Sequence, residues 1–223
     1  MKKNLLIEAI VKYVIGVVLV GALLFIPAGT LNWRNGQIFM IILFVPMFIA
    51  GIVMYVKAPD LLRSRLDNKE KEAEQKDVIG LSGIMFIASF VVAGLNYRFK
   101  WTTLPDWAVC LGIIVFLLSY LMFAEVLREN QYLSRTVKVE EDQEVVDTGL
   151  YGIIRHPMYS ASTSLFLSMP LVLGCIISFV IMLAYIPLIM KRIRNEEKVL
   201  EEGLKGYKEY KQKVRYRMIP FIW

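Results

Sequence analysis

Ile38–Val56 reads IFMIILFVPMFIAGIVMYV, a run without a single charged side chain. About 20 consecutive apolar residues are enough to cross a hydrocarbon core of roughly 30 Å as a helix. Three further blocks have the same character: Val11–Pro27, Val78–Leu95 and Trp107–Leu127. Because the apolar residues are gathered into blocks rather than spaced at a helical period, the sequence predicts a polytopic membrane protein and not a soluble domain.

A fifth apolar region, Ser160–Met190, is too long for one ordinary crossing. Pro170 and Gly174 mark a break in its middle. We therefore expect a tight helical hairpin with the arms Ala161–Gly174 and Cys175–Met190, each shorter than a comfortable span, so that the first arm need not cross the bilayer fully. The predicted fold is all-α, with about six transmembrane segments and a C-terminal cytosolic helix.

Composition agrees with this class. Of the 223 residues, 57% are hydrophobic, and the mean hydropathy is +0.52. Such apolarity is unusual for a soluble domain. The cysteines, Cys110 and Cys175, lie inside apolar blocks without Cys-x-x-Cys spacing, and the chain has one histidine. We therefore predict neither a disulfide framework nor a metal site.

Positive charge is sorted between alternate loops. One set of segments holds most of it: Lys2, Lys3, Lys57, Arg63, Arg65, Lys69, Lys71, Lys76, Arg128, Arg135, Lys138, Arg155, Lys191, Arg192 and Arg194. The other loops hold Arg34, Arg98 and Lys100. By the positive-inside rule, both termini, the loop 58–77 and the segment around Arg155 are cytosolic in a cell membrane.

The net charge of +6 needs no nucleic-acid partner, because basic cytosolic loops lie beside anionic membrane lipids. Within the charged loop, Asp60–Asp77 is expected to form a solvated amphipathic helix or a flexible segment. We divide the chain into N-terminal transmembrane helices, residues 1–130 with the loop 58–77, and a catalytic region, residues 131–223.

One cluster of polar residues precedes the hairpin, in Asp147–Tyr159, DTGLYGIIRHPMY. Its glycines allow close backbone approach, Pro157 suits the first turn of a helix, and free backbone N–H groups there can receive an anion. His156 and Tyr159 would project from this helix start. The alternative is purely structural, with Arg155 reaching lipid headgroups, His156 capping the helix and Tyr159 lying in the interfacial aromatic belt.

A second polar cluster, Lys191–Glu202, continues the hairpin out of the membrane. On an unbroken helix, Arg194 and Glu197 share a face, whereas the adjacent Glu196 and Glu197 point about 100° apart. At most one of the two glutamates readily faces an inward pocket. The alternative is a solvated face with ion pairs between successive turns.

The two clusters flank one short hairpin, so we expect them to meet at the same membrane surface in a composite site. Such a site offers a carboxylate for an ammonium, backbone amides for a carboxylate, aromatic rings for a purine and an opening to lipid for an apolar acceptor. S-adenosylmethionine carries the first three of these groups: an ammonium, a carboxylate and a purine.

These residues resemble the isoprenylcysteine carboxyl methyltransferase family and its phospholipid methyltransferase relatives. Three elements in order carry the likeness over roughly the last 80 residues: Arg155-His156-Pro157-Met158-Tyr159, the pair Glu196-Glu197, and the tail Gly206-Tyr207-Lys208-Glu209-Tyr210 through Val214, Arg217, Ile219 and Pro220. The tail departs from the family pattern, because Val214-Arg215-Tyr216-Arg217 stands where Val-Pro-Arg is common. No Rossmann glycine fingerprint is present.

The resemblance implies S-adenosylmethionine as cofactor. The implied cofactor-binding residues are His156, Tyr159, Glu196, Tyr151, Gly149, Tyr207 and Tyr210, and Arg217 would help to close the pocket. Glu197 and an arginine, Arg194 or Arg155, are the catalytic candidates, the arginine because its planar fork matches an acceptor carboxylate.

The expected acceptor is a lipophilic or lipidated molecule that reaches the site from the membrane lipids, with a carboxylate of the isoprenylcysteine type. A phospholipid amine is an alternative, and it would require a base such as His156 or a glutamate. An NADPH-dependent sterol or enoyl reductase and a non-enzymatic transporter or scaffold are the other classes that the sequence leaves open.

Overall fold

A computed structural model describes residues 2–66, 73–130, 132, 139 and 143–223 of the chain. In this part the fold is helical throughout. The elements are α1 (Lys2–Ala28), α2 (Arg34–Lys57), α3 (Pro59–Leu66), α4 (Ala73–Phe99), α5 (Asp106–Glu129), the 3-10 helix η1 (Gly149–Gly152), α6 (Pro157–Leu173), α7 (Ile176–Met182), α8 (Tyr185–Gly203) and α9 (Tyr207–Lys213).

The predicted membrane class is confirmed. Five stretches of the described residues are long and apolar enough to cross a bilayer: Asn4–Ala28, Arg34–Lys57, Lys76–Phe99, Asp106–Glu129 and Ile176–Gly203. The fifth predicted segment, the first arm of the hairpin, is α6, which has only 17 residues. The chain is therefore an integral membrane protein with five stretches that could span the bilayer and one shorter apolar helix.

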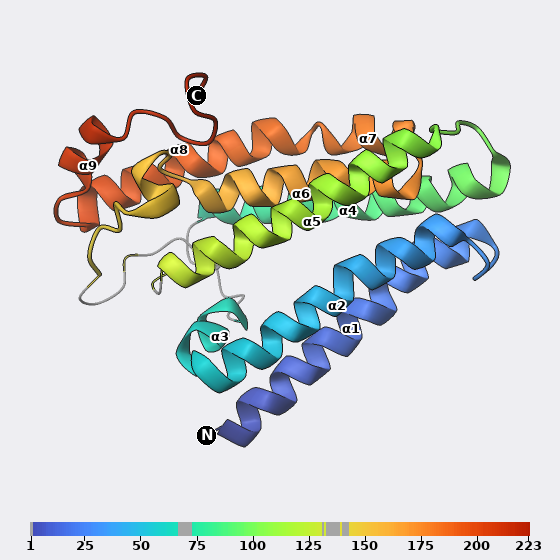
Figure 1. Ribbon diagram of the computed structural model, residues 1–223, viewed down its shortest axis with the longest axis horizontal. Helices are drawn as coiled ribbons and strands as arrows, with labels where there is room; N and C mark the ends of the chain where they lie inside the picture. The colour runs from blue at the N-terminus through green and yellow to red at the C-terminus, as the bar shows by residue number, and fades with distance from the viewer. Residues whose placement is uncertain (1, 67–72, 131, 133–138, 140–142) are drawn as a thin grey trace.

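The helices lie roughly along one direction (Figure 1). Helices α1 and α2 form an N-terminal pair, α1 packs along α4, and α6 packs along α5. The core is centred on fully buried apolar side chains such as Leu24, Phe39, Phe116 and Val172. The N-terminus, α3 and α9 lie at the same end of the molecule (Figure 1), where the polar clusters of the sequence also gather.

The hairpin turn lies at Gly174, where the predicted arms Ala161–Gly174 and Cys175–Met190 meet. Helix α6 continues through Pro170 to Leu173, and Gly174 then adopts a left-handed conformation with φ of 74°. The N–H of Cys175 donates to the carbonyl of Pro170 over 2.9 Å, and that of Gly174 donates to Leu171 over 3.0 Å. This pair of bonds is a Schellman ending, which a glycine accommodates without a Cβ penalty.

The second arm of the hairpin is longer than the predicted Cys175–Met190. It consists of α7 and α8, with a short break at Leu183 and Ala184. Pro187 explains the break, because a proline cannot donate to the carbonyl four residues earlier. Beyond it, α8 continues to Gly203 and carries the second polar cluster out of the apolar region.

Only part of the charged loop 58–77 belongs to the described residues. Pro59–Leu66 forms α3, an amphipathic helix as expected, with Leu62 buried. Lys12 of α1 donates to the carbonyl of Leu66 over 2.6 Å and so holds the end of α3 against α1. The part of the predicted amphipathic or flexible segment that covers residues 67–72 lies outside the described residues. The predicted boundary between the two regions of the chain, at 130/131, lies next to residue 131, which is also outside them.

Close packing of α4 on α1 depends on Gly94. A Cβ at this position would collide with the carbonyl oxygen of Leu24 and lie 3.0 Å from the Cβ of Pro27. We expect Gly94→Val to destabilise the fold by about 1 to 3 kcal/mol, because added methyl groups would force the two helices apart. Thermal unfolding of the detergent-solubilised protein measures this, and Gly83→Val on the same helix is a matched control, since its Cβ would meet open space. An equal effect of both substitutions would rule out close packing as the cause.

Candidate active site

The C-terminal tail pairs with the segment that precedes α6. The N–H of Arg155 donates to the carbonyl of Tyr216 over 2.9 Å, and that of His156 donates to Arg217 over 2.8 Å. The hydroxyl of Ser160, in the first turn of α6, donates to Met218 over 2.7 Å. These bonds place the tail directly beside the first polar cluster.

Glu197 of α8 lies at the centre of this arrangement. One carboxylate oxygen accepts from Nε of Arg155 over 2.8 Å and from its Nη2 over 2.7 Å, and Nε2 of His156 is 3.3 Å away. The other oxygen accepts from Nε and Nη2 of Arg217, both over 2.9 Å. The side chains of Glu197 and Arg155 are 3% and 4% exposed. Glu197 thus joins α8, the start of α6 and the tail through one buried carboxylate.

The remaining nitrogen of Arg155 is also occupied. Its Nη1 donates to the carbonyls of Val214 and Arg215, each over 2.7 Å. Its other two nitrogens donate to the carboxylate of Glu197, so all three nitrogens of the guanidinium have partners within the protein. Arg155 therefore holds the tail in place and does not present a free fork to a ligand.

Glu196 points to a different group, as the 100° spacing along the helix predicts. Its carboxylate accepts a hydrogen bond from the hydroxyl of Tyr159. Arg192, one turn earlier on α8, donates from Nε to the same hydroxyl over 2.9 Å, and its guanidinium lies 5.9 Å from the centre of the Tyr159 ring. The Tyr159 ring in turn stacks on His156, with ring centres 5.6 Å apart.

The structure thus brings together most of the predicted site residues at one end of the hairpin. His156, Tyr159, Glu196 and Glu197 form a contiguous cluster, and Arg155 and Arg217 close it from the side of the tail. The sequence analysis did not single out Arg192. Arg192 precedes Glu196 by four residues on α8, so the two side chains lie on the same face of that helix. This spacing could have identified Arg192 as a site residue.

Tyr207 and Tyr210 of α9 pack on the inner side of this cluster with Leu204 and Val214. The hydroxyl of Tyr210 donates to the carbonyl of Tyr151 over 2.7 Å. The hydroxyl of Tyr207 is buried and has no hydrogen-bond partner among the described residues. Burial raises the pKa of Tyr207, and the nearby carboxylates of Glu197 and Glu196 raise it further, so the hydroxyl remains a donor at neutral pH.

Gly149 and Tyr151 support the site from η1. Gly149 has φ of 48°, and a Cβ there would collide with the carboxylate of Glu129, which accepts from the N–H of Leu150 over 3.1 Å. Asn130, next to Glu129 at the end of α5, donates to the hydroxyl of Tyr151 over 3.0 Å. Glu129 therefore occupies the N-terminus of η1, and the sequence analysis did not anticipate this contact.

We expect Gly149→Ala to destabilise the protein by about 1 to 3 kcal/mol, because it adds a clash to an unfavourable φ. The variant Glu129→Ala/Gly149→Ala tests the cause. If the clash dominates, the double variant is more stable than the sum of the two single changes predicts, and thermal unfolding measures this coupling. Strict additivity would contradict a direct contact between Glu129 and position 149.

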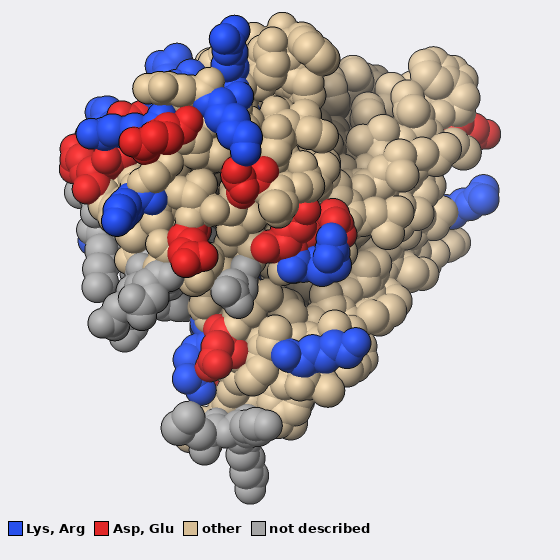
Figure 2. Space-filling model, turned by 60° about the vertical axis from the view of Figure 1, so that its left-hand side comes forward, with Lys and Arg blue, Asp and Glu red and all other residues tan. Residues whose placement is uncertain are grey.

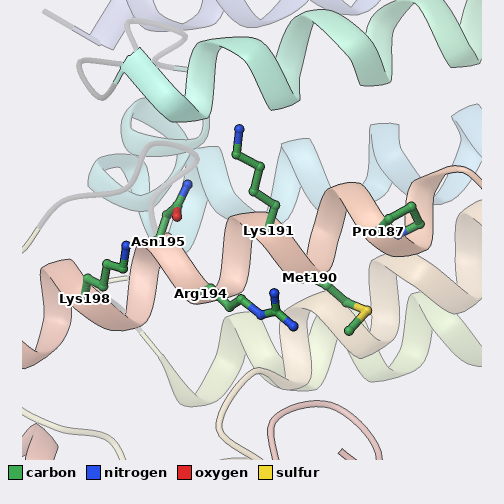
Figure 3. A pocket seen from close by; sticks show the side chains of 6 residues that line it. All are labelled: Pro187, Met190, Lys191, Arg194, Asn195 and Lys198. Carbon is green, nitrogen blue, oxygen red and sulfur yellow. The ribbon is translucent and has the colours of Figure 1, made fainter.

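Arg194 does not join the cluster. It lies about 60° around α8 from Glu197 and one turn closer to the apolar part of the helix. Its exposed side chain lines a groove of about 290 Å³ together with Pro187, Met190, Lys191, Asn195 and Lys198 (Figure 3). Of the predicted catalytic residues, Arg155 and Glu197 are therefore in contact, and Arg194 lies at the edge.

Charged side chains gather over this end of the molecule, whereas the rest of the visible face is largely uncharged (Figure 2). The geometry therefore defines a class: a helical membrane protein with a composite polar site, built from a short hairpin and a C-terminal tail at one membrane surface.

Comparison with known proteins narrows this class. Residues 109–202 match the model of the isoprenylcysteine carboxyl methyltransferase (ICMT) family, which supports the family assignment that the resemblance predicted. The match includes most of α5. It ends before the tail, which the sequence analysis had counted as a third element of the likeness.

The chain is also similar to a Delta(14)-sterol reductase of Mus musculus, with 26% identity over 91 residues. This similarity covers 40% of the chain and 22% of the reductase, so the chain matches about a fifth of that protein's length.

Proposed function

We propose that this protein is an S-adenosylmethionine-dependent methyltransferase that acts on a lipophilic carboxylate at the cytosolic membrane surface. The observation that carries the proposal is the contact of His156 and Tyr159 with Glu197 and Glu196 across the two ends of a hairpin, within the ICMT-family region. The cytosolic placement rests on the basic residues of the loops at the same end.

The donor set of the site suits S-adenosylmethionine. Glu196 would accept from the cofactor's ammonium group. The hydroxyl of Tyr207, which finds no partner among the described residues, would donate to its carboxylate. The rings of His156 and Tyr159 offer an aromatic surface to the purine. Gly149, Tyr151 and Tyr210 would shape the pocket from η1 and α9. When bound, this cofactor supplies a methyl group on a positively charged sulfur.

A carboxylate acceptor is already a nucleophile at neutral pH, so the protein needs to do little proton transfer. Its contribution would be to hold the acceptor oxygen in line with the methyl group in a dry cavity, which can supply about 7 to 11 kcal/mol. We assign the orientation of the acceptor carboxylate to Arg194, whose exposed side chain lines the groove along α8. Arg155 and Glu197 act as positioning residues, because their polar atoms are directed at one another and at the tail.

A phospholipid amine as acceptor would need a base. His156 is the candidate, since its Nε2 already faces the Glu197 carboxylate. Ester and amine products differ in stability to alkali, so the chemistry of the labelled product separates these acceptors.

A membrane reductase is the second candidate function, favoured by the similarity to the sterol reductase. Such an enzyme binds NADPH, whose 2′-phosphate needs basic groups, and Arg192 lies close to the site. We propose a calorimetric titration of the purified protein with S-adenosylmethionine and with NADPH. Binding of S-adenosylmethionine alone is the expected result, and binding of NADPH alone would overturn the methyltransferase proposal.

A further inference from the structure

A groove runs along α8 beside the proposed site. It is lined by Pro187, Met190, Lys191, Arg194, Asn195 and Lys198, and we refer to it as the α8 groove. All six side chains project from α8, with Lys191, Asn195 and Lys198 on one side and Arg194 and Met190 on the other (Figure 3).

The α8 groove carries positive charge. Its charged residues, Lys191, Arg194 and Lys198, are all cations and all exposed. The side-chain nitrogen of Asn195 is buried and finds no hydrogen-bond partner in the described part of the chain. Because that nitrogen has no accessible surface, the attraction of the α8 groove for an anion comes from its exposed cations.

The position of the groove along α8 indicates that its ligand also has an apolar part. Pro187 and Met190 belong to the apolar half of the stretch Ile176–Gly203, and Lys191 begins its charged half. The groove therefore crosses the level at which acyl chains give way to lipid headgroups. A ligand that fits it has a negatively charged head beside Lys191 and Lys198 and an apolar chain beside Met190.

Most of the groove lies on a different face of α8 from Glu197. Lys191, Asn195 and Lys198 lie about 100 to 160° around α8 from Glu197. Arg194, which we assign to the acceptor, forms the near edge. The far side of the groove is thus available to a molecule other than the methyl acceptor.

We propose that the α8 groove binds the phosphate of an anionic phospholipid, with Lys191 and Lys198 as donors and the acyl chain against Pro187 and Met190. The bound lipid covers α8 where it leaves the bilayer. This inference is independent of methyl transfer, and its test needs no turnover.

Native mass spectrometry of the purified full-length protein, titrated with phosphatidylglycerol, tests the proposal. A cation near a lipid headgroup strengthens binding by about fivefold, so Lys191→Gln/Lys198→Gln is expected to weaken affinity roughly 25-fold. The control Lys205→Gln/Lys208→Gln removes the same charge from exposed positions beyond the groove and is expected to change affinity by no more than about twofold.

Three results would overturn the proposal. Equal losses of affinity for phosphatidylglycerol in the Lys191→Gln/Lys198→Gln and Lys205→Gln/Lys208→Gln variants would indicate non-specific electrostatic attraction rather than a binding site. Equal affinity of the unmodified protein for phosphatidylcholine would show that headgroup charge is not recognised. A raised KM for a farnesylcysteine acceptor in the Lys191→Gln/Lys198→Gln variant, with phosphatidylglycerol binding unchanged, would assign the groove to the acceptor. The affinity for S-adenosylmethionine, measured separately, reports on the proposed function.

Discussion

Glu197→Gln is expected to destabilise the protein by about 3 to 5 kcal/mol and to abolish methyl transfer. Glu197 pairs with the guanidinium groups of Arg155 and Arg217, and Arg155 is almost fully buried. Removing one partner of a buried ion pair leaves an uncompensated charge in the protein interior, which is among the most costly single changes. The tail would then lose its main link to α8.

Thermal unfolding of the solubilised protein and tritium transfer from labelled S-adenosylmethionine measure the two effects. Glu202→Gln, on the exposed side of the same helix, is the control and should leave both unchanged. Adding Arg155→Met to Glu197→Gln removes one of the stranded charges, so the double variant should be less destabilised than the sum of the single effects. A Glu197→Gln protein with normal stability would contradict the central role of this carboxylate.

Glu196→Gln is expected to weaken binding of S-adenosylmethionine roughly 10- to 100-fold with little loss of stability, because a charge-assisted hydrogen bond contributes about 1.5 to 3 kcal/mol. Glu196 is only half-buried, and its partner in the described residues is the Tyr159 hydroxyl. Its carboxylate can therefore exchange that partner for the ammonium of a ligand, which Glu197 cannot do without breaking two ion pairs.

Calorimetry with the purified variants measures the affinity, and Tyr159→Phe is the companion change. It removes the hydroxyl that lies between Glu196 and Arg192 and keeps the ring against His156. We expect a smaller loss of affinity than for Glu196→Gln. If Glu196→Gln binds the cofactor normally, the ammonium is held elsewhere and our assignment of Glu196 is wrong.

Hydropathy and order along the chain were enough to predict the membrane class, the hairpin and the meeting of His156 with the paired glutamates. Helix periodicity also predicted that Glu196 and Glu197 point to different groups. These predictions succeeded because they depend on local sequence and on one short connection, which leaves little freedom in how the two ends can be placed.

The features that the sequence did not predict depend on long-range contacts. Residues 214–218 pair with the start of α6 although they lie about 60 residues later in the chain. Because of this pairing, the carbonyls of the tail occupy a guanidinium nitrogen of Arg155 that would otherwise be available to a ligand. The contact of Glu129 with Gly149 crosses from α5 to η1 and leaves no periodic signal. Of the two residues that marked the break, only Gly174 ends the helix, because a proline inside an apolar helix, as at Pro170, need not end it when the neighbouring helices support the backbone.

The most direct test of the account is transfer of tritium from methyl-labelled S-adenosylmethionine to a farnesylated cysteine acid by the purified protein in lipid. The account predicts an apolar product that releases labelled methanol on treatment with alkali, as a methyl ester does, and its loss in Glu197→Gln. Cofactor binding without such a product, or label that resists alkali on a lipid amine, would contradict the proposed transfer to a carboxylate.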